Sequence, residues 1–234
     1  MALYTIGDPH LSGGVEKPMD IFGGVWRDYQ AKLAQSFAEL LREDDLLVVA
    51  GDISWGMTLP QALPDFQFLD RFPGQKVLLK GNHDYWWETV SKMKKFFQEN
   101  AINSLLFLHN NCIFYKGTAL CGTRGWFYDP GDPSAGDDKV FRREVIRLEA
   151  SLSAARREQP DCEIFCFLHY PPVFAGNEVP EITGLLQQYG VSRCYYGHLH
   201  GESCRGAFNG LRGGVQYQLI SADALNFRPL KIME

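Results

Sequence analysis

The sequence predicts an α/β fold, an α+β layered arrangement in which helices flank mixed β-sheets. Over the first hundred residues, short apolar runs alternate with helical patterns, which is typical of βαβ units. Several short strand candidates separated by turns follow, as in a meander, and the last third returns to helix and strand. This order favours a layered sandwich with a mixed central sheet. We see no repeat or linker, so we expect one domain over residues 1–234.

In the first half, the strand candidates are apolar on both faces, as expected of strands inside a sheet. The pattern at residues 26–42 is amphipathic, with Leu33 and Phe37 on one side, and predicts a helix that makes a right-handed crossover between two strands. In chain order, we predict strands at residues 3–6, 46–50 and 76–80, and helices at residues 26–42, 62–71 and 88–99.

In the second half, the turn pairs Asn110-Asn111 and Lys116-Gly117 separate short strands. A long amphipathic helix ends before Pro160, which is a stop signal. We predict strands at residues 105–108, 112–115, 119–121, 164–168, 193–196 and 216–220, and helices at residues 137–158 and 181–189.

The composition argues against several classes of protein. The 23 Lys and Arg against 28 Asp and Glu give a net charge of -5, so we expect no stable nucleic-acid binding. The chain has no secretory signal pattern and no run of about 18 apolar residues, so we expect a cytoplasmic protein without a membrane partner. The six cysteines form no CxxC pair. We interpret them as buried free thiols, and a metal role for Cys204 is the less favoured alternative.

Residues of metal-ligand type follow five of the predicted strands. In α/β sheets, ligand sites gather beyond the carboxyl ends of strands, so these loops can converge on one cleft. A set of nitrogen and oxygen donors without thiolate suits Mn, Fe or Zn in hydrolysis, not a structural zinc site. The motifs are Asp8-Pro9-His10, Gly51-Asp52, Gly81-Asn82-His83-Asp84, His169 and Gly197-His198-Leu199-His200.

A dinuclear site needs a carboxylate that bridges two ions about 3.5–4 Å apart. Asp52 is our candidate, because it stands alone at a strand end with no competing carboxylate beside it. Asp8 and His10, at spacing i, i+2, face the same side of an extended strand end and can hold one ion together. Pro9 between them biases Asp8 toward an extended conformation.

The remaining motif residues complete a hydrolytic site. His198 and His200 repeat the i, i+2 spacing, and Asn82 offers a neutral amide oxygen. The side chain of His83 diverges from that of Asn82 and is expected to point at the substrate. Asp84 beside it is expected to hold the imidazole and favour its protonated form, which makes His83 the candidate general acid for the leaving oxygen. A metal-bound hydroxide is the expected nucleophile.

These motifs resemble those of the calcineurin-like metallophosphoesterases, and most of all the small bacterial phosphohydrolases of that family. The family pattern is D-x-H, G-D, G-N-H-[D/E], a lone H and G-H-x-H, and all five blocks occur in order over residues 8–200. The resemblance implies a β-sandwich of mixed sheets flanked by helices, and in-line hydrolysis of a phosphomonoester or phosphodiester at two metal ions. It assigns Asp8, His10, Asp52 and His200 to the first ion and Asp52, Asn82, His169 and His198 to the second, with His83 as the acid.

A departure from the pattern of the family's protein phosphatases narrows the class of substrate that we expect. Protein serine/threonine phosphatases of the family usually carry Asp-Arg after the second block and Glu after the third. Here Ile53-Ser54 follows Asp52, and Asp84 follows His83. The arginine that usually clamps phosphate is missing at that place, which favours a small phosphoester over a phosphoprotein.

Residues beside the motifs leave alternatives open. Tyr85, Trp86 and Trp87 either pack the next helix, which we favour for the group, or stack on a substrate, for which Tyr85 is a binding candidate. Arg124 either replaces the missing phosphate clamp or forms a surface salt bridge. The glycine-bordered segment 13–24 is either a flap over the cleft or an ordinary surface loop.

For three other residues we expect no role in the site. His109 is predicted to be a turn residue. Arg142 and Arg143 are predicted to lie on a solvated helix face. Our hypothesis is a dinuclear metal-dependent phosphoesterase whose partner is a small phosphoester. The competing hypotheses are a non-catalytic metal-binding interaction scaffold of the same fold and a nuclease.

Overall fold

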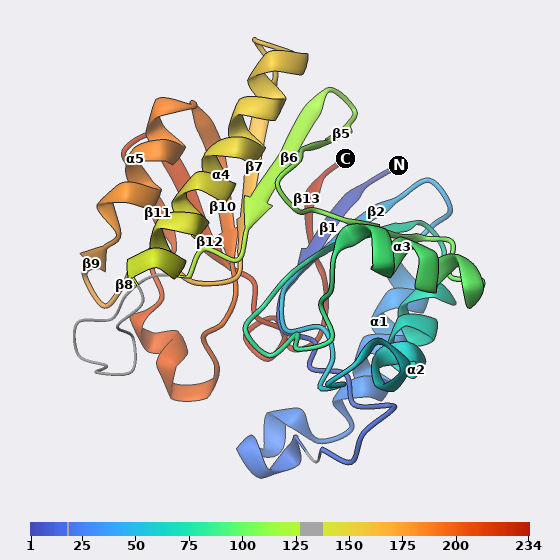
Figure 1. Cartoon of the computed structure of the whole chain (residues 1–234). Helices are drawn as coiled ribbons and strands as arrows, with labels where there is room; N and C mark the ends of the chain where they lie inside the picture. Colours follow the sequence, from blue (N-terminus) through green and yellow to red (C-terminus); the bar gives the residue numbers. More distant parts are fainter. Residues whose placement is uncertain (18, 127–137) are drawn as a thin grey trace.

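The computed structural model describes residues 1–17, 19–126 and 138–234 of the chain. Their strands form two large sheets packed face to face, with helices on both outer sides (Figure 1). The layered α/β prediction and the sandwich implied by the resemblance are confirmed. The expectation of one central sheet is wrong, because the strands divide between two sheets.

The first sheet has the strand order β13-β1-β2-β3-β4. Strands β1 to β4 are parallel to one another, and β13 is antiparallel to β1. The sequence predicted four of these strands but not β13, which closes one edge. The bounds are β1 (Leu3–Ile6), β2 (Leu46–Ala50), β3 (Gln75–Leu79), β4 (Leu105–Phe107) and β13 (Leu230–Met233).

The second sheet has the order β11-β12-β10-β7-β6-β5. Its four central strands are parallel, and the outer strands β5 and β11 are antiparallel to their neighbours. A separate small hairpin of β8 and β9 lies after β7. The bounds are β5 (Ile113–Tyr115), β6 (Thr118–Thr123), β7 (Glu163–Leu168), β8 (Val173–Phe174), β9 (Asn177–Glu178), β10 (Val191–Tyr196), β11 (Gly210–Arg212) and β12 (Val215–Leu219).

Three apolar clusters hold the layers together. The cluster between the sheets joins Val48 and Val77 of the first sheet to Phe165 and Phe167 of the second, and all four side chains are buried. The other two clusters lie between each sheet and its own helices. Both faces of the central strands are therefore buried, which explains why these strands are apolar on both faces.

Five helices cover the outer faces in the part of the chain that the structure describes. Helices α1 to α3 lie on the side of the first sheet, and α4 and α5 lie on the side of the second (Figure 1). Helix α1 begins three residues later than predicted, because Asp28 adopts φ 55° and residues 24–26 form a separate 3-10 turn. The bounds are α1 (Tyr29–Leu40), α2 (Leu59–Asp70), α3 (Val90–Glu99), α4 (Asp138–Glu158) and α5 (Pro180–Gln188).

Helix α2 begins earlier than the predicted residue 62. The Thr58 hydroxyl accepts a hydrogen bond from the Gln61 amide, and a proline occupies the first turn, where its missing N–H costs nothing. Residue 137, the predicted start of α4, lies outside the described residues. Among the helices that the structure describes, none is long and apolar enough to cross a membrane.

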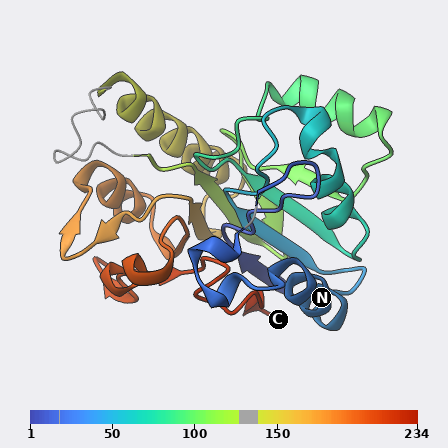
Figure 2. The ribbon, with the colours of Figure 1, turned by 90° about the horizontal axis from the view of Figure 1, so that it is seen from below.

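The topology brings the predicted ligand motifs to one edge. Because β1 to β3 are parallel to one another, and β6, β7 and β10 are parallel to one another, the carboxyl ends within each sheet share an edge. The Gly7 amide donates to the Ile220 carbonyl at 2.7 Å, which ties the two sheets together there. Figure 2 looks onto this edge, where the 3-10 turns η1 (Asp20–Phe22), η2 (Gly24–Trp26) and η4 (Gly201–Gly206) border the strand ends.

Candidate active site

The backbone of the ligand loops turns sharply directly after the strands. Asp8, His10, Asp52 and His198 have φ values of 55°, 45°, 46° and 70°, in the left-handed region that costs non-glycine residues about 1–3 kcal/mol each. The predicted extended conformation of Asp8 is therefore wrong. The Asp8 amide donates to the Gly51 carbonyl at 3.0 Å and the His10 amide donates to the Asp52 carbonyl at 2.9 Å. These bonds between neighbouring loops override the local effect of Pro9.

Two motif glycines leave room for the carboxylates. A Cβ at Gly197 would lie 3.1 Å from the Asp8 Cγ, and a Cβ at Gly81 would lie 2.8 Å from the Asp52 Cγ. Both separations are too short for an ordinary contact, so each carboxylate rests directly against a glycine. Packing thus explains why glycine occupies these two positions. The loop that supplies one candidate ligand leaves space for the carboxylate of another.

The first group of candidate ligands is Asp8, His10 and His200. Their donor atoms lie within 4.8 Å of one another. The Nε2 atoms of His10 and His200 are 3.3 Å apart, and the Nε2 of His200 is 3.9 Å from an Asp8 oxygen. Asp8 and His10 are buried, whereas His200 is partly exposed.

The second group is Asp52, His169 and His198, whose donor atoms also lie within 4.8 Å of one another. The Asn82 side-chain oxygen lies 2.6 Å from the Nε2 of His169, so the amide predicted as a ligand faces the same group. The Nδ1 of His169 lies 3.3 Å from the Ala50 carbonyl. An Nδ1–H that donates to this carbonyl leaves the Nε2 lone pair free to bind a cation.

Asp52 belongs to the second group and also faces the first. One of its carboxylate oxygens is 3.7 Å from the Nε2 of His10, and the other is 3.5 Å from the Nε2 of His169. The amide of His83 also donates to Asp52 at 2.8 Å, which fixes the carboxylate. The structure therefore brings together all seven residues predicted as ligands, with the predicted bridging carboxylate beside both groups. Their role as metal ligands remains a prediction.

The electrostatics of the groups suit cations. Burial lowers the pKa values of His10, His169 and His198 to about 3, so these imidazoles are uncharged and offer lone pairs. Burial raises the pKa of Asp8 to about 8, and the neighbouring Asp52 charge adds to this. The buried carboxylates of Asp8 and Asp52 are an unfavourable pair by themselves, because like charges repel where water is excluded. Metal ions would stabilise it, so the residues fit two hard or borderline cations.

One supporting residue was missed by the sequence analysis. Asp223, which follows β12, accepts a hydrogen bond from the Nδ1–H of His200 at 2.8 Å and another from the Gly201 amide at 2.9 Å. Burial lowers the pKa of His200, but the hydrogen bond to Asp223 and the nearby carboxylates raise it more strongly, so the net shift is upward. A carboxylate behind a ligand histidine orients the ring and raises its basicity.

His83 lies at the open side of the groups, with 36% of its side chain exposed. Its Nε2 is 4.0 Å from an Asp52 oxygen, and its ring lies 4.5 Å from the Trp55 ring. Trp55 also stacks on His10 at 4.9 Å and was not recognised from the sequence. The indole therefore holds two imidazoles of the site in place. The position of His83 agrees with a residue that reaches a substrate.

Asp84 does not hold the His83 imidazole as predicted. Its oxygens accept hydrogen bonds from the Ile53 amide at 2.8 Å, the Gly81 amide at 2.7 Å and the Trp86 indole at 3.0 Å. The carboxylate is fully buried, and burial raises its pKa to about 7. Asp84 is therefore a structural clamp between two ligand loops. Adjacency in sequence was misleading here, because side chains of neighbouring residues point in different directions.

The residues beside the motifs fall into two kinds, those that are buried in the core and those that lie near the site. Trp86 and Trp87 are buried and pack, so the packing interpretation is confirmed for them. Tyr85 is 58% exposed, and its ring lies 6.3 Å from that of His83. The Arg124 guanidinium lies 3.4 Å from the buried carboxylate of Glu144 in a cavity beside the site, so it is neither a simple surface salt bridge nor directly among the ligands. The substrate roles of Tyr85 and Arg124 remain predictions.

The predicted flap, residues 13–24, contains the turn η1 and ends at the first residue of η2, and residue 18 within it lies outside the described residues. Ile21 and Phe22 in the segment are exposed, whereas Trp26, two residues beyond it, is buried with its ring 5.8 Å from that of His10. At the other end of the segment, the Gly13 amide donates to Asp65 at 2.7 Å. The segment thus borders the site, and its movement remains a prediction.

The cysteines are free in the structure, as predicted, and three of them are buried. The Cys204 thiol donates to the Leu199 carbonyl at 3.3 Å, and Cys204 belongs to neither candidate ligand group. The less favoured metal role of Cys204 therefore gains no support from the described residues.

Known proteins of similar fold share this architecture. A solved structure of a protein of unknown function from Aquifex aeolicus is 15% identical, with a TM-score of 0.54, and the match covers 98% of this chain and 95% of that one. The phosphopantetheinyl hydrolase from Mycobacterium tuberculosis is 14% identical with a TM-score of 0.56, covering 99% and 95%. A protein from Thermus thermophilus is 12% identical with a TM-score of 0.58, covering 99% and 97%. At these identities the likeness shows the fold alone.

Sequence comparison identifies the family. No curated protein matches the chain in a sequence search. The family model for calcineurin-like phosphoesterases, however, matches residues 1–202, which include all five ligand motifs. The chain therefore belongs to the calcineurin-like phosphoesterase family.

Proposed function

We propose that the chain is a dinuclear metal-dependent phosphoesterase that hydrolyses a small phosphomonoester or phosphodiester. The observation that carries the proposal is the position of Asp52, whose one carboxylate oxygen faces His10 of the first group while the other faces His169 of its own group. Family membership supports it, because calcineurin-like phosphoesterases typically bind two metal ions. The first group would hold one ion with Asp52, and the second group would hold the other with Asn82.

Mn, Fe or Zn suits these nitrogen and oxygen donors. When bound, a pair of such ions supplies Lewis-acid stabilisation of the phosphoryl oxygens and activation of water for in-line attack. The protein's own contribution is to fix the donors. Strained loop backbones, the Asp84 clamp and the Asp223–His200 hydrogen bond all hold donor atoms in place before any substrate arrives.

His83 is the proposed general acid for the leaving oxygen. Its ring is accessible from the open side and is held against Trp55, so a leaving group can approach Nε2 while the imidazole keeps its orientation. A positioned general acid contributes about 10²–10⁴-fold to a rate. Tyr85 extends the same open side and offers an exposed aromatic face to an apolar or aromatic part of the substrate.

The test uses metal-stripped protein refilled with Mn²⁺ and two chromogenic substrates, p-nitrophenyl phosphate and bis(p-nitrophenyl) phosphate. We expect Asp52→Asn to lose metal and to lower turnover by about 10³-fold or more. We expect His83→Ala to keep both metals and to lose about 10²–10⁴-fold in kcat. The preferred substrate then decides between monoesters and diesters.

Asp44→Asn is the matched control for Asp52→Asn, because Asp44 is exposed and lies outside the site. Metal content is measured for every variant, so a loss of metal is distinguished from a loss of chemistry. A wild-type protein that binds two metals but hydrolyses neither substrate would contradict the proposal and favour the interaction scaffold. Hydrolysis unaffected by His83→Ala would remove His83 from the mechanism.

A further inference from the structure

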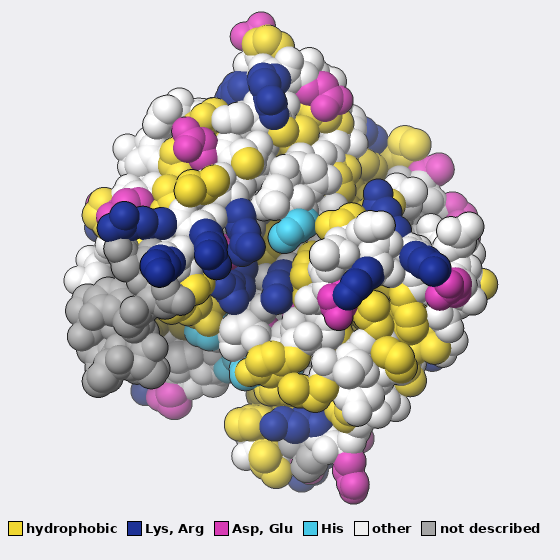
Figure 3. Space-filling model, viewed as in Figure 1, with side chains coloured by type: hydrophobic (Ala, Val, Ile, Leu, Met, Phe, Trp, Pro, Cys, Tyr) yellow, Lys and Arg dark blue, Asp and Glu magenta, His cyan; other side chains and the backbone are white. Residues whose placement is uncertain are grey.

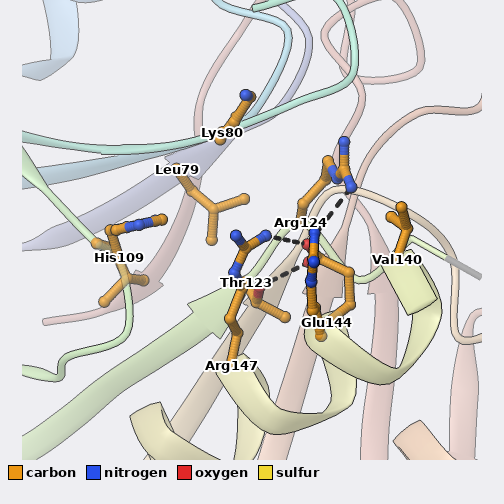
Figure 4. Close-up of a pocket in the computed structure, with 10 residues that line it drawn as sticks. Leu79, Lys80, His109, Thr123, Arg124, Val140, Glu144 and Arg147 are labelled. Atoms are coloured by element: carbon orange, nitrogen blue, oxygen red, sulfur yellow. Dashed lines mark hydrogen bonds and ion pairs between the residues drawn. The ribbon is translucent and has the colours of Figure 1, made fainter. Parts of the chain in front are cut away.

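A cavity of about 200 Å³ lies beside the candidate metal centre. Its walls come from the ends of β3 and β6, the segment after β4, and helix α4. Dark-blue Lys and Arg side chains gather around a hollow in the space-filling view (Figure 3), and the close-up shows the cavity's lining residues (Figure 4). The charged lining residues, which we call the basic cavity, are Lys80, Arg124, Arg143, Glu144 and Arg147.

The basic cavity has a surplus of positive charge. Four cationic side chains and one carboxylate, that of the fully buried Glu144, line the cavity. Glu144 accepts hydrogen bonds from the Thr123 hydroxyl at 2.9 Å and from Arg147 at 2.6 Å, and Arg124 lies at 3.4 Å. Figure 4 shows these groups converging on the one carboxylate. The oxygens of Glu144 therefore already accept hydrogen bonds from residues that hold α4 to the end of β6.

The other cationic groups lack an acceptor. Within residues 1–17, 19–126 and 138–234, neither Lys80 nor Arg143 makes a hydrogen bond or an ion pair, and the buried Nε–H of Arg124 has no acceptor. Arg143 is exposed, as predicted for a solvated helix face, and it also lines this cavity. Cationic groups without a protein acceptor around a hollow, together with the one buried unpaired donor of Arg124, favour an oxyanion as the ligand, because it supplies both charge and acceptors.

The basic cavity shares a wall with the metal centre. Lys80 directly precedes Gly81-Asn82, the third ligand motif. The Arg124 carbonyl accepts hydrogen bonds from the amides of His169 at 3.1 Å and Tyr170 at 2.9 Å, so the loop after β6 is joined to a ligand loop. The two sites are therefore built on adjoining loops, and a molecule that reached both would have one end at the candidate metal centre and the other in the basic cavity.

We propose that the basic cavity binds a second phosphoryl group of the substrate, so that the preferred substrate carries two phosphoryl groups. The proposal rests on the proposed function for the group at the metal centre. Arginine suits this task because its planar guanidinium donates two parallel hydrogen bonds to phosphate oxygens, and lysine adds a point charge. A small cavity in a chain of net charge -5 fits a small polyanion rather than a nucleic-acid backbone.

The test measures binding rather than turnover. Calorimetry on Mn²⁺-loaded protein compares alkylphosphonates with α,ω-alkanebisphosphonates of about three or more carbons, and metal content is checked after each titration. We expect a bisphosphonate of matching length to bind about tenfold or more tighter than the monophosphonate of the same chain. Lys80→Gln and Arg143→Gln should each remove most of this gain. Neither side chain is paired in the described structure, so the fold does not depend on them.

The matched control is Arg157→Gln, which removes an exposed arginine of the same helix outside the cavity and should leave the gain unchanged. The proposal is overturned if no bisphosphonate exceeds its monophosphonate, or if Lys80→Gln and Arg143→Gln leave the gain intact. A second monophosphonate site that both variants abolish, without any bisphosphonate gain, would overturn it too and assign the cavity to free phosphate. Because no hydrolysis is measured, a failure of the proposed activity does not alter these outcomes.

Discussion

The candidate metal centre, which we call the metal centre below, and the basic cavity are built on adjoining loops at the strand ends, but they need ligands of opposite charge. In the metal centre, the buried carboxylates of Asp8 and Asp52 face imidazoles that are mostly uncharged. In the basic cavity, four cations and the one carboxylate of Glu144 line the walls. The first needs cations and the second needs an anion, so neither is balanced by the chain alone. The comparison teaches that a ligand with two phosphate groups would suit both places only when metal ions occupy the first, because those ions supply the positive charge that the basic cavity supplies by itself.

The two sites also differ in how they are held. The ligands of the metal centre stand on loops with left-handed backbone, fixed by hydrogen bonds from neighbouring loops. The basic cavity depends on helix α4, which Glu144 joins to the end of β6 through Thr123 and the Gly125 amide. Backbone hydrogen bonds therefore hold the metal centre in place. The buried side chain of Glu144 holds the cavity in place. Changes to each site should affect different measurable properties.

The largest effect on stability is expected from Glu144→Ala. The change leaves Arg124 and Arg147 without their carboxylate and removes the acceptor of the Thr123 hydroxyl. We expect the free energy of unfolding to fall by about 3 kcal/mol, measured by denaturant titration. Glu144→Gln should lose about half as much, because the amide oxygen still accepts hydrogen bonds.

Glu149→Ala is the control for Glu144→Ala, since Glu149 is an exposed residue of the same helix. It should change the free energy of unfolding by less than about 0.5 kcal/mol. Equal stabilities of the Glu144 and Glu149 variants would show that the buried carboxylate does not fix α4. Metal content should be unchanged in both variants, because neither residue belongs to a ligand group.

A smaller effect, confined to the metal centre, is expected from Asp223→Asn. An asparagine amide can donate to Nδ1 of His200, which would favour the tautomer with its proton on Nε2 and so block metal binding there. We expect the affinity of the ion held by His200 to fall about 10–100-fold, measured by competition with a chelating dye. The other ion should bind as before, and the exposed Asp44→Asn should have no effect. Equal weakening of both ions would contradict the assignment.

The sequence located the residues of the candidate metal centre far better than those of the basic cavity. Its ligands follow apolar runs directly, so strand ends and motif spacing located them, and Asp223 follows the predicted strand at 216–220 in the same way. The strand-end rule applied to that strand would have found Asp223, although no histidine or glycine motif marks it. Glu144 offers no such signal, because its burial depends on how α4 packs against β6.

Local rules failed where tertiary contacts were stronger. Pro9 favours an extended Asp8, yet hydrogen bonds between loops hold Asp8 in a left-handed conformation. Asp84 was assigned to His83 by adjacency, but amides of two loops use its oxygens. Strand β13 was missed because a single short edge strand at the end of the chain has little pattern of its own. These are contacts between distant segments, which periodicity does not encode.

The smallest expected effect concerns Asp65, which joins α2 to the loop after the first ligand motif. Asp65 is buried, accepts hydrogen bonds from the Gly13 amide and the Ser54 hydroxyl, and has its pKa raised by burial from 3.8 to about 6. A raised pKa means that the folded state holds this proton more tightly than the unfolded state. The stabilisation is therefore fully present below about pH 4 and is lost as the pH rises through about 6.

Asp65→Asn removes this titration while keeping an acceptor for the Gly13 amide. In denaturant titrations of the metal-free proteins, wild type and variant should be about equally stable near pH 4, where Asp65 is uncharged. Near pH 8 the variant should exceed the wild type by about 1 kcal/mol, because it buries no charge. A constant difference between the two proteins across this range would show that Asp65 does not titrate there. Metal binding by the variant should be unchanged, since Asp65 contacts the supporting residues Gly13 and Ser54 rather than a ligand.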